Sequence, residues 1–165
     1  MNLLAESGPL RAWRCVHDDV MGGRSTGHVT QNEAGHVHFQ GTVSLENGGG
    51  FASVRSDAAL DVASATGLLV RGYGPPRRYR LTLRTETAPR ISYRLPFWTT
   101  PRPAWHYLPF ARVRPMRRGQ PRPDAPPFDA TAICELGFLI GDKQEGDFVL
   151  HVMHLAVYNN GVGGQ

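Results

Sequence analysis

The sequence predicts an all-β protein, built as an antiparallel β-sandwich or jelly roll, and three observations support this fold class. Many short segments alternate apolar and polar residues with a period of two, which is typical of half-buried strands. Glycine- and proline-rich turns separate these segments. No segment has the length and pattern of a helix that could cross between parallel strands. The 165 residues fit one domain, residues 1–165, with a single core.

Ten segments are predicted to be strands. The clearest is Val37–Leu45, where apolar side chains take every second position, and Arg78–Arg84 and Ile91–Phe97 show the same alternation. One further segment, Ala58–Ala65, would tolerate a short helix. The other predicted strands are apolar runs bounded by turn residues, and in chain order they are Leu10–Val16, Arg24–Thr30, Phe51–Arg55, Gly67–Gly72, Trp105–Val113, Ile133–Ile140 and Phe148–Tyr158.

Positive charge is concentrated in the middle of the chain. Between Arg71 and Arg122 there are 13 arginines and a single acid, Glu86. Arginine offers planar, bidentate donors that suit carboxylates, phosphates and aromatic rings. Two interpretations stay open: an ordinary solvated sheet face, which we favour, and a surface for an anionic partner, nucleic acid included. The second interpretation rests on Arg78, Arg80, Arg84, Arg90 and Arg94.

Prolines mark the irregular parts of the same region. They gather in Pro96–Pro109 and Pro115–Pro127. Because proline has no N–H to donate to a strand ladder, it is confined to loops and sheet edges. We therefore expect loops or edge strands in both stretches.

The sequence also predicts the compartment. The longest apolar stretch, Phe148–Tyr158, contains two histidines and falls short of the roughly 18 residues of a membrane span. The first 13 residues lack the basic start and apolar run of a leader, so we expect a cytoplasmic protein. In that setting Cys15 and Cys134 are expected to be reduced thiols.

A polar segment follows the first predicted strand. Adjacent carboxylates precede a Gly-Gly turn, which is followed by Arg and Ser. The carboxylates could hold a hard cation or a polyol, with the glycines letting backbone approach the ligand. Alternatively the segment is a tight turn in which Asp19 pairs with Arg24 or Arg55, and we favour this structural role. The candidate residues here are Asp18, Asp19, Met21, Gly22, Gly23, Arg24 and Ser25.

A glycine-rich loop joins the next two predicted strands. Gly48–Gly50 runs into Phe51 and a strand pattern, so the loop is not a phosphate-binding loop that opens a helix. Asn47 and Arg55 could line a ligand cleft beside it. A hairpin with residues at positive φ explains the glycines equally well.

The sequence contains no recognisable motif for catalysis, metal binding or cofactor binding. It contains no nucleophile elbow, Cys-x-x-Cys pair, His-Glu-x-x-His or dinucleotide-binding glycine motif, so we expect a protein that is not an enzyme and has no cofactor. His36 and His38 share a face of one strand, but that face is expected to be in solvent, and no metal site is predicted. His151 and His154 are expected on opposite faces of their strand.

Aromatic residues cluster between positions 93 and 107. They could form a stacking platform for a sugar, or they could pack in the core, which we favour. The residues concerned are Tyr93, Trp98, Trp105 and Tyr107.

The strings Asp-Asp-Val-Met-Gly-Gly-Arg-Ser (18–25) and Glu-Asn-Gly-Gly-Gly-Phe-Ala-Ser-Val-Arg (46–55) resemble those of the complex I intermediate-associated protein family. Later segments around Arg71, Trp105 and Gly137 add to the resemblance, which runs from about Trp13 to about Tyr158. It implies a galactose-binding-like β-sandwich, and a role like that of the mitochondrial members, which are assembly factors for respiratory complex I. The family usually has Gly-Asp-Gly after Arg71, whereas this chain has Gly72-Tyr73-Gly74, so the contact of that acid is absent.

We therefore expect a non-catalytic binding module. The resemblance implies a protein partner, with subunits of respiratory complex I first, and an assembly-factor or chaperone-like role. Two alternatives stay open: a carbohydrate-binding module of galactose-binding-like type, and an anion- or RNA-binding surface on the arginine-rich strands. Besides the polar segment at 18–25, the candidate binding residues are Asn47, Arg55, Arg71, Trp98 and Trp105.

Overall fold

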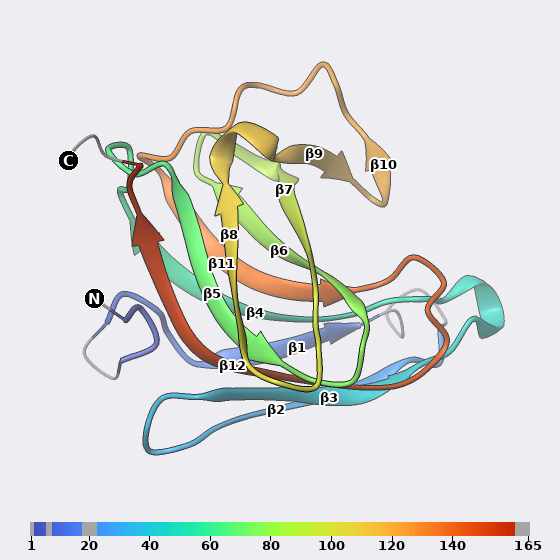
Figure 1. Ribbon diagram of the computed structural model, residues 1–165. Coiled ribbons are helices and arrows are strands. Elements are labelled where there is room, and N and C mark those ends of the chain that lie inside the picture. Colours follow the sequence, from blue (N-terminus) through green and yellow to red (C-terminus); the bar gives the residue numbers. More distant parts are fainter. Residues whose placement is uncertain (1, 6–7, 18–22, 161–165) are drawn as a thin grey trace.

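Two antiparallel sheets pack face to face in the computed structural model, which describes residues 2–5, 8–17 and 23–160 (Figure 1). The seven-stranded sheet has the order β1 (Trp13–His17), β4 (Ala52–Leu60), β11 (Ile133–Ile140), β6 (Arg78–Thr85), β7 (Ala88–Trp98), β9 (Arg114–Arg117) and β10 (Gln120–Pro121). The five-stranded sheet has the order β2 (Thr26–Gln31), β3 (Val37–Val43), β12 (Gly146–Tyr158), β5 (Gly67–Tyr73) and β8 (Ala104–Pro109). The predicted all-β sandwich is confirmed.

Helical structure in the described residues is limited to two 3-10 turns, η2 (Glu46–Gly48) and η3 (Phe110–Arg112). No described helix is long and apolar enough to cross a membrane. The short helix that Ala58–Ala65 would tolerate does not form, because β4 continues to Leu60 beside β11. The proline-rich stretch after Pro115 forms β9 and β10 at the edge of the sheet, as the prolines predict.

The core lies between the sheets and is built by strand alternation. Phe39 of β3 and Phe148 of β12 meet edge to face with ring centroids 4.9 Å apart, and both are fully buried. Tyr93 is 1% exposed, and its hydroxyl donates a hydrogen bond to the carbonyl of Pro126 at 2.6 Å. The core position predicted for Tyr93 is therefore confirmed.

The core position favoured for the other clustered aromatics is wrong. Trp98 is 62% exposed, Trp105 46% and Tyr107 64%. The reason is alternation: Phe97 of β7 and Leu108 of β8 point inward, so their neighbours in the strand point outward.

The same alternation fixes the outer face of the seven-stranded sheet. Tyr79, Leu81 and Leu83 of β6 are fully buried, so the alternate positions of the strand point away from the core. These outward positions are occupied by Arg78, Arg80, Thr82 and Arg84.

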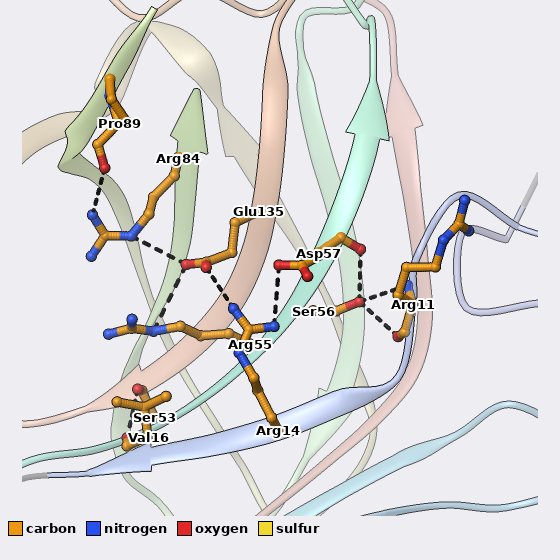
Figure 2. A network of polar contacts seen from close by, with 10 residues as sticks. All are labelled: Arg11, Arg14, Val16, Ser53, Arg55, Ser56, Asp57, Arg84, Pro89 and Glu135. Carbon is orange, nitrogen blue, oxygen red and sulfur yellow. Dashed lines mark hydrogen bonds and ion pairs between the residues drawn. The ribbon is translucent and has the colours of Figure 1, made fainter. Parts of the chain in front are cut away.

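Glu135 links four strands of this sheet by its charge (Figure 2). It follows a bulge near the start of β11, and its carboxylate accepts hydrogen bonds from Arg14 of β1 at 2.9 Å and from Arg84 of β6 at 3.1 Å. The Nε atom of Arg55 on β4 lies 3.8 Å from the same carboxylate, and Arg14 also pairs with Asp57 at 3.2 Å. Arginines that would repel one another are therefore held by a shared anion.

Both cysteines are free thiols, as the sequence predicts. Cys15 lies on β1 and Cys134 on β11, and both are half-buried. Burial raises the pKa of each thiol, so both remain protonated at neutral pH.

The expected placement of the β12 histidines is wrong. A register shift between Val152 and His154 inserts a bulge, and both His151 and His154 lie on the outer face of the five-stranded sheet. His151 stacks on Tyr73 with ring centroids 4.4 Å apart, and its Nδ1 atom lies 3.0 Å from Nδ1 of His38. The described residues contain no group of three or more potential ligands that could hold a metal ion.

Replacing Glu135 by Gln is expected to lower the free energy of unfolding by about 2 kcal/mol. The physical reason is that three guanidinium groups lose the anion between them. Chemical denaturation of the wild type and the variant measures this loss. Glu33→Gln, at an exposed carboxylate in the β2–β3 turn, is the matched control. A loss no larger than that of the control would contradict a stabilising role for Glu135.

Acidification is expected to destabilise the protein partly through His151. Burial, with a smaller contribution from His38, lowers the pKa of His151, so the unfolded chain binds the proton more tightly than the folded one. Stability therefore falls as the pH drops from about 7.5 to about 5.5. Thermal unfolding at the two pH values should show a smaller fall for His151→Gln than for the wild type. The control His28→Gln, at an exposed histidine of β2, should keep the full fall, and equal falls in all three proteins would refute the prediction.

Candidate functional site

Four arginines converge on the outer face of the seven-stranded sheet, and we call them the arginine tetrad. Across the strands, Arg55 of β4 lies opposite Gly137 of β11, Gly137 opposite Thr82 of β6, and Thr82 opposite Arg94 of β7. Arg80 and Arg84 stand two residues on either side of Thr82, on the same face of β6. The tetrad is therefore Arg55, Arg80, Arg84 and Arg94, with Gly137 and Thr82 between its members.

Gly137 lets the neighbouring strands and the Arg55 side chain pack closely at the centre of the tetrad. A Cβ atom at this position would lie 2.4 Å from the carbonyl oxygen of Val54, 2.9 Å from Oγ1 of Thr82 and 3.2 Å from Cγ of Arg55. The neighbouring backbone thus permits only glycine there. Next to it, Thr82 is short and 7% exposed.

A cavity of about 930 Å³ opens between the members of the tetrad and the neighbouring loops. All four members of the tetrad line it, and Gly49 and Gly50 of the glycine-rich loop close one end. Among the described lining residues the acid is Asp142 alone, whereas the cations, in addition to the tetrad, are Arg90, Arg117, Arg118 and Lys143. The cavity is therefore strongly positive.

A second cavity of about 890 Å³ adjoins the first. It shares Arg80, Arg94 and Met116 with the first cavity and continues past the edge of β7 toward Tyr107 of β8. The two cavities together form a groove across one end of the sheet.

The protein's own carboxylates neutralise three members of the tetrad. Arg55 and Arg84 face Glu135, and Nη1 of Arg80 donates to Asp142 at 2.9 Å. The exception is Arg94, which donates from Nε to the Ser92 hydroxyl at 3.1 Å and forms no ion pair with any described carboxylate.

The electrostatic surroundings of Arg94 reflect this imbalance. Burial is the main cause that lowers the pKa of Arg94 to about 10, and the charges of Arg80, Arg84 and Arg55 lower it further, whereas the Asp142 carboxylate has a smaller effect in the opposite direction. Burial also lowers the pKa of Arg55, where Glu135 opposes the effect. Because arginine stays charged at neutral pH, the cavity holds a cation that an external anion would stabilise.

The polar segment at 18–25 is only partly described. Asp18, Asp19, Met21 and Gly22 lie outside the described residues. Gly23 is buried and Arg24 is exposed. Ser25 is buried, accepts a hydrogen bond from the backbone N–H of Ser44 at 3.0 Å and donates one to the Ser44 carbonyl, contacts that join two strands.

The other predicted binding residues are dispersed. Asn47 is exposed in η2 at a φ of 55°, a conformation that the loop imposes. The Arg71 guanidinium lies 5.5 Å from the ring centroid of Trp105 on the outer face of the five-stranded sheet. Trp98 ends β7 of the other sheet, where Arg78 lies 6.0 Å from its ring centroid. The two tryptophans therefore do not share a platform.

Arg55 is the predicted binding residue that the structure brings into the cavity. Arg80, Arg84 and Arg94 belong to the anion-binding surface that the sequence offers as an alternative, and that surface does not include Arg55. Gly137 is a local sign of the site, since a glycine inside an apolar strand marks a close approach of backbone.

Solved structures share this fold. A family 11 carbohydrate-binding module of the cellulosomal cellulase Lic26A-Cel5E of Clostridium thermocellum is 11% identical, with a TM-score of 0.71 over 100% of this chain and 97% of that chain. The Clostridium thermocellum module in complex with a β-1,3-1,4-mixed-linked tetrasaccharide is 10% identical, with a TM-score of 0.64 over 92% and 95%. An agarase, AgWH50C, is 7% identical, with a TM-score of 0.62 over 98% of this chain but 25% of that chain. These similarities establish the β-sandwich fold.

Sequence comparison identifies the family. No curated protein sequence matches this chain. The family model described as Complex I intermediate-associated protein 30 (CIA30) matches residues 3–152, nearly the whole chain, in agreement with the motifs at 18–25 and 46–55. The chain therefore belongs to the CIA30 family.

Proposed function

We propose that this protein is a non-catalytic binding module that holds a partner protein during the assembly of respiratory complex I. Membership of the CIA30 family supports the assembly context. The groove on the seven-stranded sheet offers a binding surface, because its lining is dominated by cations that face solvent.

The single observation that carries the proposal is the charge imbalance of the groove. A purely structural ion network pairs its cations with anions, as Glu135 does for its three arginines. In contrast, Arg94 forms no ion pair with a described carboxylate and adds a cation to a cavity that is already positive. Charge complementarity of this kind fixes the register of a partner and speeds its association.

A carbohydrate-binding role is the second candidate. The names of the structural neighbours favour it, and Trp98 offers one exposed indole ring on the outer face of the same sheet. The described lining of the first cavity includes neither Trp nor Tyr, but the second cavity is lined by Tyr107, which is 64% exposed. Recognition by charge has more support than stacking of a sugar, because cations are far more numerous than exposed aromatic rings in the described lining.

Affinity capture tests the proposal. The tagged protein is expected to enrich complex I subunits from detergent-solubilised membranes of its source organism. The double variant Arg90→Glu/Arg118→Glu should lose this enrichment, because both exposed residues line the cavity. The matched control Arg11→Glu/Arg102→Glu changes two exposed arginines outside both cavities and should retain the partner. Quantitative mass spectrometry compares the three samples.

Two results would overturn the proposal. One is the absence of complex I subunits from the wild-type sample. The other is saturable binding of mixed-linkage glucan that is lost in Trp98→Ala and unaffected by salt, which would favour the carbohydrate role instead.

A further inference from the structure

The spacing of the arginine tetrad leaves room for an extended chain. Arg55 and Arg94 are separated by three strand spacings, so their Cα atoms are about 14 Å apart across the sheet. Arg80 and Arg84 are four residues apart on β6, or about 13 Å along the strand. All four side chains line the same cavity of about 930 Å³, so the guanidinium groups border a hollow rather than a filled surface.

Some guanidinium N–H groups of the tetrad remain available to bind a ligand. Arg94 uses its Nε–H on Ser92, and no other hydrogen bond of its guanidinium is found within the described residues. Arg80 binds Asp142 through one of its terminal nitrogens. Since each guanidinium has five N–H donors, a ligand in the cavity can be bound by two arginines at once.

We infer that the arginine tetrad is a carboxylate-binding subsite, which takes acidic side chains of an extended segment of the partner protein. The inference rests on the proposed function and names the chemistry that the partner presents. It also assigns the central role to Arg94, the member of the tetrad without an anion of its own.

Contacts within the site favour carboxylates. Glu135 and Asp142, the anions already bound by the tetrad, are both carboxylates and accept from guanidinium N–H groups at 2.9–3.1 Å. Apolar side chains of Leu139, Met116 and Pro89 lie between the arginines in the cavity lining. A peptide that alternates acidic and small apolar residues can satisfy both kinds of surface, because its side chains alternate every residue.

Single-stranded nucleic acid fits the same surface less well. Such ligands stack successive bases on exposed aromatic rings, and in the described lining of the groove the exposed ring is Tyr107 of the second cavity. One exposed ring offers a stacking platform for one base, whereas the cations extend along both cavities. The second cavity continues the first one past Arg80 and Arg94. A site of this length fits an extended peptide segment better than a single small anion.

Fluorescence anisotropy with a labelled peptide tests the inference. The probe is a short synthetic peptide of alternating Glu and Ala, and a Gln-Ala peptide of the same length is the uncharged control. Wild-type protein should bind the Glu-Ala peptide and not the Gln-Ala peptide. Arg94→Gln should weaken binding by about tenfold, because a charge-assisted contact is lost from a partly desolvated site. The matched variant Arg102→Gln, at an exposed arginine outside both cavities, should leave it unchanged.

Further measurements in the same binding experiment distinguish the alternative outcomes. Equal binding of the Glu-Ala peptide by wild type and Arg94→Gln would overturn the inference. Tighter binding of an oligothymidylate of equal charge, lost in Arg94→Gln, would replace the peptide by nucleic acid. Should Arg94→Gln fail to unfold cooperatively, Arg90→Gln at the exposed rim supplies the test, and its expected effect is a smaller weakening of the same sign.

Capture from membranes separates this inference from the proposed function. If complex I subunits are captured equally by wild type and Arg94→Gln, the assembly role stands and the tetrad is not its carboxylate subsite. If the Glu-Ala peptide requires Arg94 but no complex I subunit is captured, the subsite stands and the partner assignment fails.

Discussion

Repulsion between arginines is the constraint on which the functional face of this sandwich depends. Strand alternation places Tyr79, Leu81 and Leu83 of β6 in the core and therefore places Arg78, Arg80 and Arg84 of the same strand on the outer face. Each of these cations would raise the energy of its neighbours unless an anion lies between them. Glu135 and Asp142 supply that anion for most of the face, and the bulge near the start of β11 accompanies the placement of Glu135 between arginines of three strands.

Arg94 is the member of the tetrad that forms no ion pair with a described carboxylate. Its guanidinium is half-buried, surrounded by the other members of the tetrad and hydrogen-bonded to a neutral serine. Such an arrangement costs stability in the isolated protein and gains it when an anion binds, which is a general property of preorganised binding sites. The carbohydrate-binding modules with the same fold demonstrate that sandwiches of this architecture bind ligands, but at 10–11% identity they share the fold alone.

The sequence predicted the architecture well because alternation is a local signal. Val37 and Phe39 on β3, and Tyr93 on β7, were placed in the core from their period alone, and the structure confirms them. Alternation also contained the information that Trp98 is out of phase with Phe97, although we favoured a core position for it. His151 and His154 were misplaced because a bulge adds a residue to one strand, and a single sequence does not show where the period slips.

The candidate site was predicted only in part, since it depends on strand order. Arg55 meets Arg84 and Arg94 because β4 and β6 flank β11, a strand that comes roughly 50 to 80 residues later in the chain. Such long-range pairing leaves no trace in local periodicity. The motif at 18–25 identified the family, but its Asp18 and Asp19 lie outside the described residues, so their role stays a prediction.

The unneutralised charge of Arg94 is the central claim, and the most direct measurement of it is thermal unfolding in the presence of a dicarboxylate. Wild type and Arg94→Gln are unfolded in rising concentrations of succinate, with chloride at matched ionic strength as the reference. The account predicts that succinate raises the Tm of the wild type more than that of Arg94→Gln, because an anion that binds only the folded state stabilises it by mass action. Parallel increases in the two proteins would mean that Arg94 binds no anion, and they would contradict the account.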